Sequence, residues 1–372
     1  MVHLTERLDL PSPSPGTERH LLVHRFGTPG ARPKAYLHAG LHAAELPGIV
    51  VLDHLLDRLA EADAAGRVTG EVVVVPFANP IGLAQQLFME AQGRYDIDTN
   101  RNYNRGFPNL ADEVAGRVEG RLGDDGAANV ALVRTAMAEA LAARRDAREP
   151  EVLKALLLGL SHDADLVLDL HSAWEALLHL LITDINWPDG EDLARQIGAE
   201  VVLVDRGNRL MTFKSAHVFV WKTLAKRFPQ APFAPLPLVA VVELRGQRDV
   251  DDHLTRPDAD NLFHLLQRRG VVAGNPGPLP EARNGALSTR GLWRLFAETF
   301  GVLVYHRDLG DRVVAGEPFC HIVDPETRTR TPVLAPVDGL LYARRSHRYT
   351  RQGQYFCAIA GDVPHEGEER DV

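Results

Sequence analysis

The sequence predicts an α/β fold, in which a mixed central sheet flanked by helices is followed by a small all-β, barrel-like domain. Over the first two-thirds of the 372 residues, short aliphatic runs alternate with amphipathic stretches, which is the pattern of a sheet covered by helices. From about Asn275 the character of the chain changes: the turn-rich linker GNPGPLPEARNG precedes short β-like runs separated by turns. We therefore expect a first domain over residues 1–275 and a second over residues 276–372.

The first domain should alternate strands with helices. Strands are expected at Lys34–His38, Glu71–Pro76, Asp165–His171, Glu200–Asp205 and Leu238–Leu244. Helices are expected at Leu46–Ala65, Asn129–Arg145, Asp189–Ile197 and Asp258–Arg269. The polar, glycine-rich segment Gly106–Gly126 is expected to be an irregular surface excursion. The proline-rich stretch Arg227–Pro237 excludes a regular helix and predicts an extended connection.

The C-terminal region contains a short internal repeat. Gly316–Ile322 (GEPFCHI) recurs as Gly353–Ile359 (GQYFCAI), with the apolar residues at matching offsets. Two related β halves that pack together predict a small sandwich or barrel. Cys320 and Cys357 fall at equivalent positions in the two copies, and burial in a core is the commonest use of a non-catalytic cysteine. We therefore expect both to be core residues rather than metal or redox groups.

The composition argues against several classes of protein. A formal charge of −9, with arginines scattered among acidic residues, argues against a nucleic-acid partner, which needs a clustered basic face. The first residues lack the apolar core of a secretion signal, and no run approaches the ~20 apolar residues of a membrane span. Two cysteines do not make a disulfide framework. We expect a cytoplasmic protein without a membrane partner, and the sequence leaves a homo-oligomer open.

The first motif with chemistry is YLHAGLHAAELPG. A strand over Lys34–His38, followed by a turn and a helix, would place His42 and Glu45 three residues apart at the turn, where they can point at one spot. An imidazole with a carboxylate suits Zn²⁺ better than Mg²⁺ or Ca²⁺, which prefer oxygen ligands. His38 offers a rival pair with His42, but Gly40 and the strand-to-turn context argue against a helix there. Taken alone, H-x-x-E is common enough by chance to be explained as surface polar residues near a helix start.

The second motif, DLVLDLHS, is an aliphatic strand that ends in Asp169, His171 and Ser172. Ligand sites in open α/β folds gather at the carboxyl edge of the sheet, where such a strand delivers its polar residues. A single histidine at this place would more often be structural. With His42 and Glu45, however, it completes two histidines and one carboxylate, the ligand set of a catalytic zinc with an open fourth position.

The third motif, VAVVELRG, is again an aliphatic strand with a carboxylate, Glu243, at its end. Such a glutamate could cap a neighbouring loop or pair with Arg245. In the context of a zinc site it is the best candidate for the general base that takes a proton from metal-bound water. Arg245 could help to choose the substrate, and a structural ion pair is the equal alternative.

The polar loop Gly93–Arg105 (GRYDIDTNRNYNR) carries more hydrogen-bonding groups than a connector needs. The planar fork of an arginine suits a substrate carboxylate, so a substrate clamp is one interpretation of this loop. A solvated basic loop is the other.

Together these motifs resemble the succinylglutamate desuccinylase/aspartoacylase family of zinc-carboxypeptidase-like hydrolases. The resemblance covers nearly the whole chain, from GLHAAE through ANPIG, DTNRNYNR, LDLHS and VELRG to the terminal β region, in matching order and spacing. It implies a zinc-carboxypeptidase-like fold with one Zn²⁺ per chain, held by His42, Glu45 and His171.

The resemblance also implies roles for further residues. Glu243 would be the general acid and base. Asn100 and Arg101 would match an Asn-Arg pair that grips a carboxylate of the substrate, and Asp98 would match the aspartate that orients a ligand imidazole. Arg94 is the best match to the arginine that stabilises the tetrahedral oxyanion, a role worth ~3–4 kcal/mol for one such donor.

The activity implied is hydrolysis of the amide bond of a small N-acyl amino acid, or a related amide, by metal-activated water. A metallocarboxypeptidase acting on short peptides is the nearest alternative, and a catalytically silent member that binds a ligand in the same cleft is another. The β region is similar to the C-terminal domain of this branch and, more distantly, to lipoyl- or biotin-carrier domains. No lysine follows Lys226 to carry either group, so we expect this region to shape the mouth of the site.

Overall fold

The computed structural model describes residues 3–207, 210–361 and 363. Its largest feature is a nine-stranded mixed sheet. In spatial order the strands are β1 (Leu4–Asp9), β2 (His20–Gly27), β4 (Glu71–Val75), β3 (Lys34–Ala39), β7 (Leu166–Ala173), β11 (Leu238–Gly246), β9 (His179–Thr183), β10 (Val201–Asp205) and β12 (Ala286–Ser288). The central strands β4, β3, β7 and β11 are mutually parallel, whereas β1, β2 and β9 introduce antiparallel pairs. The mixed central sheet predicted from the sequence is confirmed.

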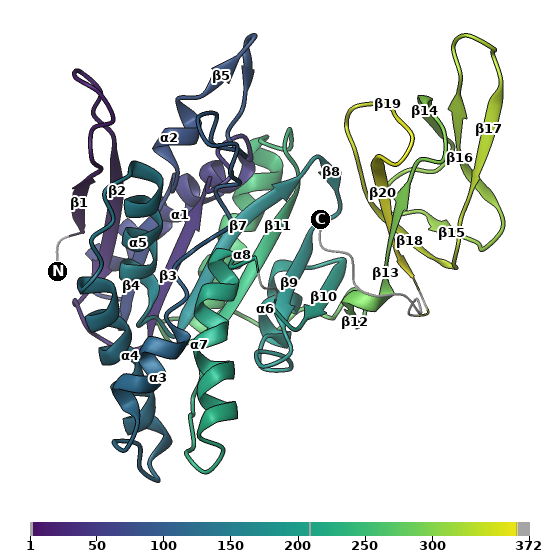
Figure 1. Ribbon diagram of the computed structural model, residues 1–372. Coiled ribbons are helices and arrows are strands. Elements are labelled where there is room, and N and C mark those ends of the chain that lie inside the picture. Colours follow the sequence, from purple (N-terminus) through teal and green to yellow (C-terminus); the bar gives the residue numbers. More distant parts are fainter. Residues whose placement is uncertain (1–2, 208–209, 362, 364–372) are drawn as a thin grey trace.

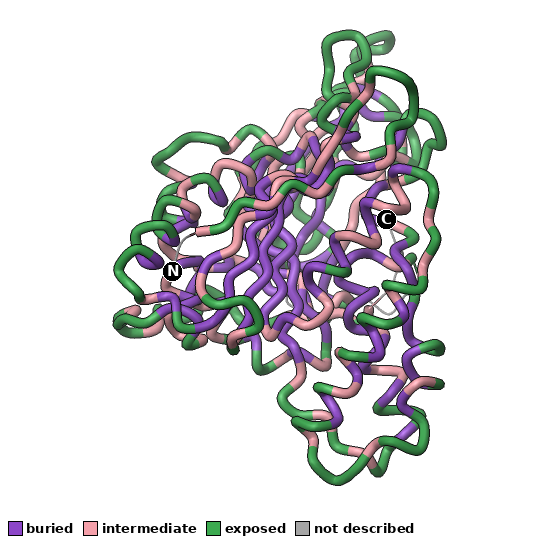
Figure 2. The backbone as a smooth tube through the Cα atoms, turned by 90° about the vertical axis from the view of Figure 1, so that its left-hand side faces the viewer, coloured by how far each residue is buried: buried purple, intermediate pink, exposed green. Residues whose placement is uncertain are grey.

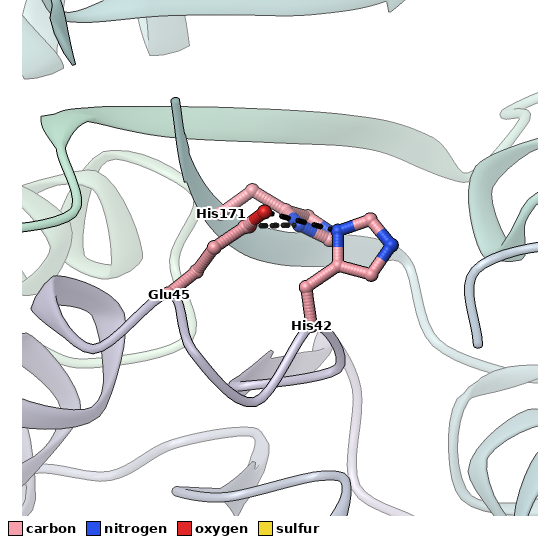
Figure 3. A group of neighbouring side chains, drawn as sticks. All are labelled: His42, Glu45 and His171. Carbon is pink, nitrogen blue, oxygen red and sulfur yellow. Dashed lines mark hydrogen bonds and ion pairs between the residues drawn. The ribbon is translucent and has the colours of Figure 1, made fainter. Parts of the chain in front are cut away.

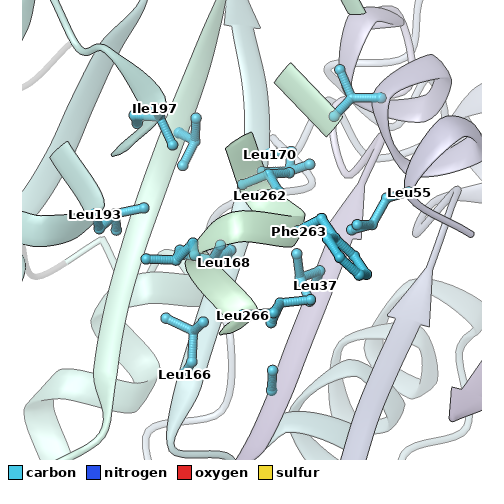
Figure 4. Packing of buried hydrophobic residues seen from close by; sticks show 14 of the residues in the cluster. Leu37, Leu55, Leu166, Leu168, Leu170, Leu193, Ile197, Leu262, Phe263 and Leu266 are labelled. Atoms are coloured by element: carbon cyan, nitrogen blue, oxygen red, sulfur yellow. The ribbon is translucent and has the colours of Figure 1, made fainter. Parts of the chain in front are cut away.

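Helices cover both faces of this sheet (Figure 1). They are α1 (Pro47–Ala64), α2 (Pro80–Leu83), α3 (Ala111–Val118), α4 (Gly126–Ala142), α5 (Glu149–Ser161), α6 (Glu191–Ile197), α7 (Phe213–Arg227) and α8 (Asp252–Arg268). Side chains of β7 alternate between the faces: Leu168 packs in a cluster with residues of α1 and α8 (Figure 4), and Val167 packs with residues of α5 and α7. Because the central strands are buried on both faces (Figure 2), β4 and β7 are mostly aliphatic, whereas β3 also buries Lys34, Tyr36 and His38.

The strands expected in the first domain are all present, with ends shifted by two residues at most. The four expected helices are also present, but α8 begins at Asp252 and runs across Pro257, so the start expected at Asp258 comes too late. The structure adds β1, β2, β9, α5 and α7, which the sequence patterns do not predict. The proline-rich stretch between α7 and β11 contains no helix or strand in described residues 228–237, as expected.

The irregular excursion expected over Gly106–Gly126 is wrong, because this segment contains α3. Its apolar residues Leu110, Val114 and Val118 recur at helical spacing, and they are buried in a cluster with residues of α4 and α7. The helical spacing of these apolar residues is short and lies among glycines and acidic residues, so it is not recognisable in the sequence. The helix is evident from its packing against α7.

The C-terminal region is all β, as predicted. One sheet contains β13 (Leu292–Phe296), β20 (Tyr355–Gly361), β18 (Gly339–Arg344) and β15 (Arg312–Val313), and the other contains β17 (Arg330–Leu334), β16 (Pro318–Val323), β14 (Gly301–Tyr305) and β19 (Tyr349–Thr350). These sheets do not close into one another, so the barrel-like form is not confirmed. The repeat places β16 and β20 in opposite sheets, and Cys320 and Cys357 are both buried in the core between them.

A short strand from each part of the chain pairs with a sheet of the other part. The short strand β8 (Glu175–Ala176), which directly follows β7, pairs with β18 of the C-terminal region. Conversely, β12 follows residue 275 but pairs with β10 at the edge of the central sheet. Because strands on each side of the expected boundary pair with the other part, the division between residues 275 and 276 remains a prediction. The pairing of β8 with β18 connects the C-terminal region to β7, the strand that carries His171.

No helix in the described part of the chain is long and apolar enough to cross a membrane.

His217 on α7 should make the stability of the fold depend on pH. The imidazole of His217 is buried, with its ring centroid 4.9 Å from that of Phe213. Burial lowers the pKa of His217 to about 3. In the unfolded chain this histidine has a pKa of ~6.5 and is protonated as the pH falls below that value. In the folded protein it stays neutral down to about pH 3, so protonation favours the unfolded chain between these two values. This histidine should therefore lower the free energy of unfolding by up to ~1.4 kcal/mol per pH unit in that window. Urea unfolding of the wild type and His217→Gln should give a shallower slope for the variant, and equal slopes would contradict the prediction.

Candidate metal centre

Three side chains meet at the carboxyl edge of the central sheet. β3 ends at Ala39, and Gly40, with φ of 69°, turns the chain so that His42 and Glu45 follow before α1 begins. β7 is the parallel neighbour of β3 and carries His171 near its own carboxyl end. Because adjacent parallel strands end at the same edge, the three side chains converge from two distant segments (Figure 3).

The distances within this group suit a metal ion. The Nδ1 atom of His42 lies 3.1 Å from Glu45 Oε1, and the Nδ1 atom of His171 lies 2.7 Å from Glu45 Oε2. All three residues are buried, and one ligand atom from each lies within 4.8 Å of the others. Three donors around a tetrahedral Zn²⁺ lie roughly 3.3 Å apart, given bond lengths of ~2.0–2.2 Å. The group could therefore hold a single divalent ion.

The far nitrogen of each imidazole supports the same conclusion. His42 Nε2 lies 2.8 Å from Asn102 Oδ1, and His171 Nε2 lies 2.9 Å from Asp169 Oδ1. Because both partners can accept, a proton on each Nε2 would leave each Nδ1 free to bind a metal ion beside Glu45. A side-chain oxygen that fixes the tautomer of a ligand histidine is the usual arrangement around a bound metal. The donor set thus fits Zn²⁺ in chemistry as well as in distance.

The family resemblance implies that Asp98 orients a ligand imidazole, but Asp98 is exposed, and Asn102 and Asp169 make these contacts instead. A signal for Asp169 was present, because it lies two residues before His171 and therefore on the same face of β7. Asn102 could not be distinguished from the other polar residues of its loop.

Two Asn-Arg pairs occur in this loop, and the structure treats them differently. Asn100 and Arg101, the pair named from the sequence, are exposed. Asn104 is buried; its Nδ2 atom lies 3.2 Å from His171 Nε2, and its Oδ1 accepts a hydrogen bond from the backbone of Phe213. The pair formed by Asn104 and Arg105 is therefore the one beside the metal ligands.

Arg94 lies directly against the ligand group. Its Nη1 atom donates to Glu45 Oε1 at 2.8 Å and lies 3.3 Å from His42 Nδ1, while 43% of its side chain remains exposed. The close approach depends on Gly93, whose carbonyl accepts from the backbone of Ala43 and whose position would bring a Cβ within 2.5 Å of the Ala43 side chain.

Glu243 stands beside His171 on the neighbouring strand, since the two residues are paired in the register of β11 and β7. Burial, helped by the negative charge of Glu45, raises the pKa of Glu243 to about 7. For Glu45 the balance is opposite: burial raises its pKa, but the two histidines outweigh burial and lower it. A carboxyl group with a pKa near neutrality can both take up and release a proton at working pH.

Arg245 belongs to a different surface. Its Nη1 lies 3.3 Å from Asp258 Oδ1 on α8, and a second, shorter contact joins the same two side chains. Both residues line a cavity of about 370 Å³ that contains none of the three metal ligands. The geometry therefore supports the structural ion pair rather than contact with a substrate at the metal centre.

The fold and the site together define a mixed α/β protein with a candidate metal centre at the carboxyl edge of its central sheet. A sequence profile of the succinylglutamate desuccinylase/aspartoacylase catalytic domain matches residues 31–220, which is more than half of the chain and includes His42, Glu45 and His171. The chain belongs to this family, as its motifs predicted. The family consists of hydrolases that act on amides of small acylated amino acids.

Solved structures share the fold over almost the whole chain. A protein assigned to this family from Shewanella frigidimarina NCIMB 400 matches with a TM-score of 0.86 and 21% identity, over 98% of this chain and 99% of that chain. One from Shewanella amazonensis SB2B gives 0.85 and 22%, over 96% and 99%. The product-bound ectoine utilization protein EutE (DoeB) from Ruegeria pomeroyi gives 0.68 and 17%, over 97% and 96%. At these identities the likeness shows the fold alone. No curated protein matches the sequence.

Replacing Asn102 should weaken metal binding. Asn102→Ala removes the acceptor that holds His42 Nε2, and loss of such a partner typically lowers metal affinity by ~10–100-fold. Asp98→Ala, in the same loop, is the matched control and should leave the affinity unchanged. Competition with a chromogenic zinc chelator measures both, and a larger loss in the Asp98 variant would restore the role assigned from the sequence.

Proposed function

We propose that this protein is a zinc-dependent amidohydrolase that removes the acyl group from a small N-acyl amino acid, using one Zn²⁺ held by His42, Glu45 and His171. The observation that carries the proposal is the direction of the two imidazoles: both Nδ1 atoms face the Glu45 carboxylate, and both Nε2 atoms are held by oxygen acceptors. Family membership supplies the reaction class, and this donor set supports the choice of zinc.

In the proposed reaction the ion would activate the water, and side chains of the protein would move the protons. Zn²⁺ bound here would supply a Lewis acid and lower the pKa of a water molecule to ~7. Glu243, paired in register with His171, takes a proton from the attacking water and delivers it to the leaving nitrogen. Its pKa of about 7 suits both steps, because a group that must accept and then donate works best near the ambient pH.

Arg94 is the proposed stabiliser of the oxyanion that forms at the acyl carbon. Its guanidinium lies against Glu45 and His42 and is still partly exposed, so that it faces the metal group on one side and solvent on the other. A metal ion on Glu45 would satisfy the same carboxylate and leave the arginine to a substrate oxygen. A preorganised positive donor at this place acts where the negative charge develops.

The C-terminal region supports a small substrate. β8, which begins four residues after His171, is paired with β18, so the C-terminal sheet lies beside the carboxyl edge where the metal ligands meet (Figure 1). Glu175 of β8 accepts from Arg344 and Arg348 at 2.7 Å each, which fixes this contact. A C-terminal sheet held at this edge would favour an N-acyl amino acid over an extended peptide.

Glu243→Gln should abolish most of the turnover without removing the metal. The amide keeps the shape of the side chain but cannot accept a proton, so we expect kcat to fall by ~10²–10⁴-fold, with zinc content at one per chain. Steady-state assays over acetyl, succinyl, formyl and aromatic N-acyl amino acids, with elemental analysis of the metal, test this. Unchanged turnover in the variant, or zinc-free wild-type protein, would overturn the mechanism. Faster turnover of short peptides would instead assign a metallocarboxypeptidase.

The substrate carboxylate can be assigned by comparing two arginines. Arg101 is the residue named from the motif, with Asn100 beside it, and Arg105 occupies the equivalent place next to the buried Asn104. Because Asn104 lies against His171, we expect Arg105→Ala to raise KM by ~10-fold or more and Arg101→Ala to change it less. Measured values of KM and kcat for both variants decide between them, and the reverse order would return the clamp to Arg101.

A further inference from the structure

A chain of buried side chains extends from His171 away from Glu45 and into the core. Asp169 Oδ1 lies 2.9 Å from His171 Nε2 and 2.7 Å from His38 Nε2, and His38 Nδ1 lies 2.9 Å from the hydroxyl of Tyr36. Tyr36 and His38 have no exposed surface, and Asp169 is 1% exposed. Neither Tyr36 nor His38 contacts the metal ligands directly in any described hydrogen bond, and the proposed reaction uses neither of them.

The strand pairing explains how this chain is built. His38 of β3 is paired in register with Asp169 of β7, the parallel neighbour. Side chains two residues apart on a strand point to the same face, so Tyr36 and His38 share one face of β3, and Asp169 and His171 share the same face of β7. Two short patterns, Y-x-H and D-x-H, thereby become one connected row. The Phe213 ring of α7 covers it, with its centroid 4.5 Å from that of His38.

With a metal ion on His171 Nδ1, the hydrogen bonds of this row would all run in one direction. His171 Nε2 has two contacts, Asp169 Oδ1 at 2.9 Å and Asn104 Nδ2 at 3.2 Å, and a proton on Nε2 would be donated to the nearer one, the Asp169 oxygen. The same oxygen accepts from His38 Nε2–H, which leaves His38 Nδ1 to accept from the Tyr36 hydroxyl. Asp169 Oδ2 has no hydrogen-bond partner among the described residues. The two imidazoles are therefore the side chains that satisfy this buried carboxylate, and without His38 one of them would be lost.

We propose that His38, oriented by Tyr36, is a positioning residue for the metal centre: it holds the Asp169 carboxylate and, through it, the His171 imidazole in the direction that binds the ion. A buried carboxylate with only one donor would turn or draw in water to complete its hydrogen bonds, and His171 would turn with it. The inference rests on the metal site of the proposed function, and it is independent of the substrate.

His217 offers a matched comparison. It is also a buried histidine packed on Phe213, with ring centroids 4.9 Å apart, but its Nε2 lies 3.0 Å from Ser161 Oγ instead of Asp169. Removing either imidazole deletes similar volume from the same part of the core. Only the removal of His38 also removes a donor from the row that ends at His171.

The test is zinc affinity, measured by competition with a chromogenic chelator, together with the visible spectrum of the cobalt-substituted protein. His38→Leu should bind zinc ~10–100-fold more weakly and shift the cobalt bands, since partners beyond the ligands contribute on this scale. His38→Gln, which keeps an N–H donor, should recover most of the affinity, and Tyr36→Phe should lose less than His38→Leu. His217→Leu should bind zinc as the wild type does.

The outcomes separate this inference from the proposed function. A wild type that binds no zinc would refute the metal site itself. Wild-type affinity in His38→Leu, or an equal loss in His217→Leu, would refute the positioning role while leaving the metal site intact. Where His38→Leu does not fold, the glutamine and phenylalanine variants carry the test, and an affinity for His38→Gln as low as that of a zinc-ligand variant His171→Ala would overturn the proposal.

Discussion

The parallel pairing of β3 and β7 is the constraint on which the site depends. Their register sets His38 against Asp169, and their shared carboxyl edge brings the turn with His42 and Glu45 to His171. Aliphatic side chains on both faces hold this register, because a slip of one residue would turn the polar side chains of each strand to the opposite face. The three candidate ligands are thus positioned by the same packing that stabilises the sheet.

Around this pairing the structure buries several charged or polar groups in one place. Glu45, Asp169 and Glu243 lie close to two imidazoles and the Arg94 guanidinium, and the pKa values of the carboxyl groups diverge. The histidines lower those of Glu45 and Asp169 despite burial, whereas burial dominates at Glu243 and raises its pKa to about 7. Opposite shifts among neighbouring carboxyl groups are what the proposed roles need: a charged carboxylate at Glu45 and a proton carrier at Glu243.

The C-terminal region extends this organisation beyond the central sheet. It contacts the catalytic part through β8, and the guanidinium of Arg345 stacks over the ring of Trp174 at 5.1 Å, just after the strand that carries His171. With Glu175 paired to two arginines, the edge of the site and the C-terminal sheet form one connected surface. A change in the C-terminal region can therefore reach the edge of the candidate metal centre without altering His42, Glu45 or His171.

Local patterns along the chain were enough to predict the α/β class, the central strands, the β character of the C-terminal region and the group of His42, Glu45 and His171. These features follow from local periodicity and from polar residues placed at the ends of aliphatic strands, both of which are written along the chain. The groups that hold the two imidazoles could be identified only once distant segments were seen packed together. Asn102 and Asp169 take that role because their loop and strand pack beside the ligands, and a motif cannot show which of several similar polar residues a fold turns inward.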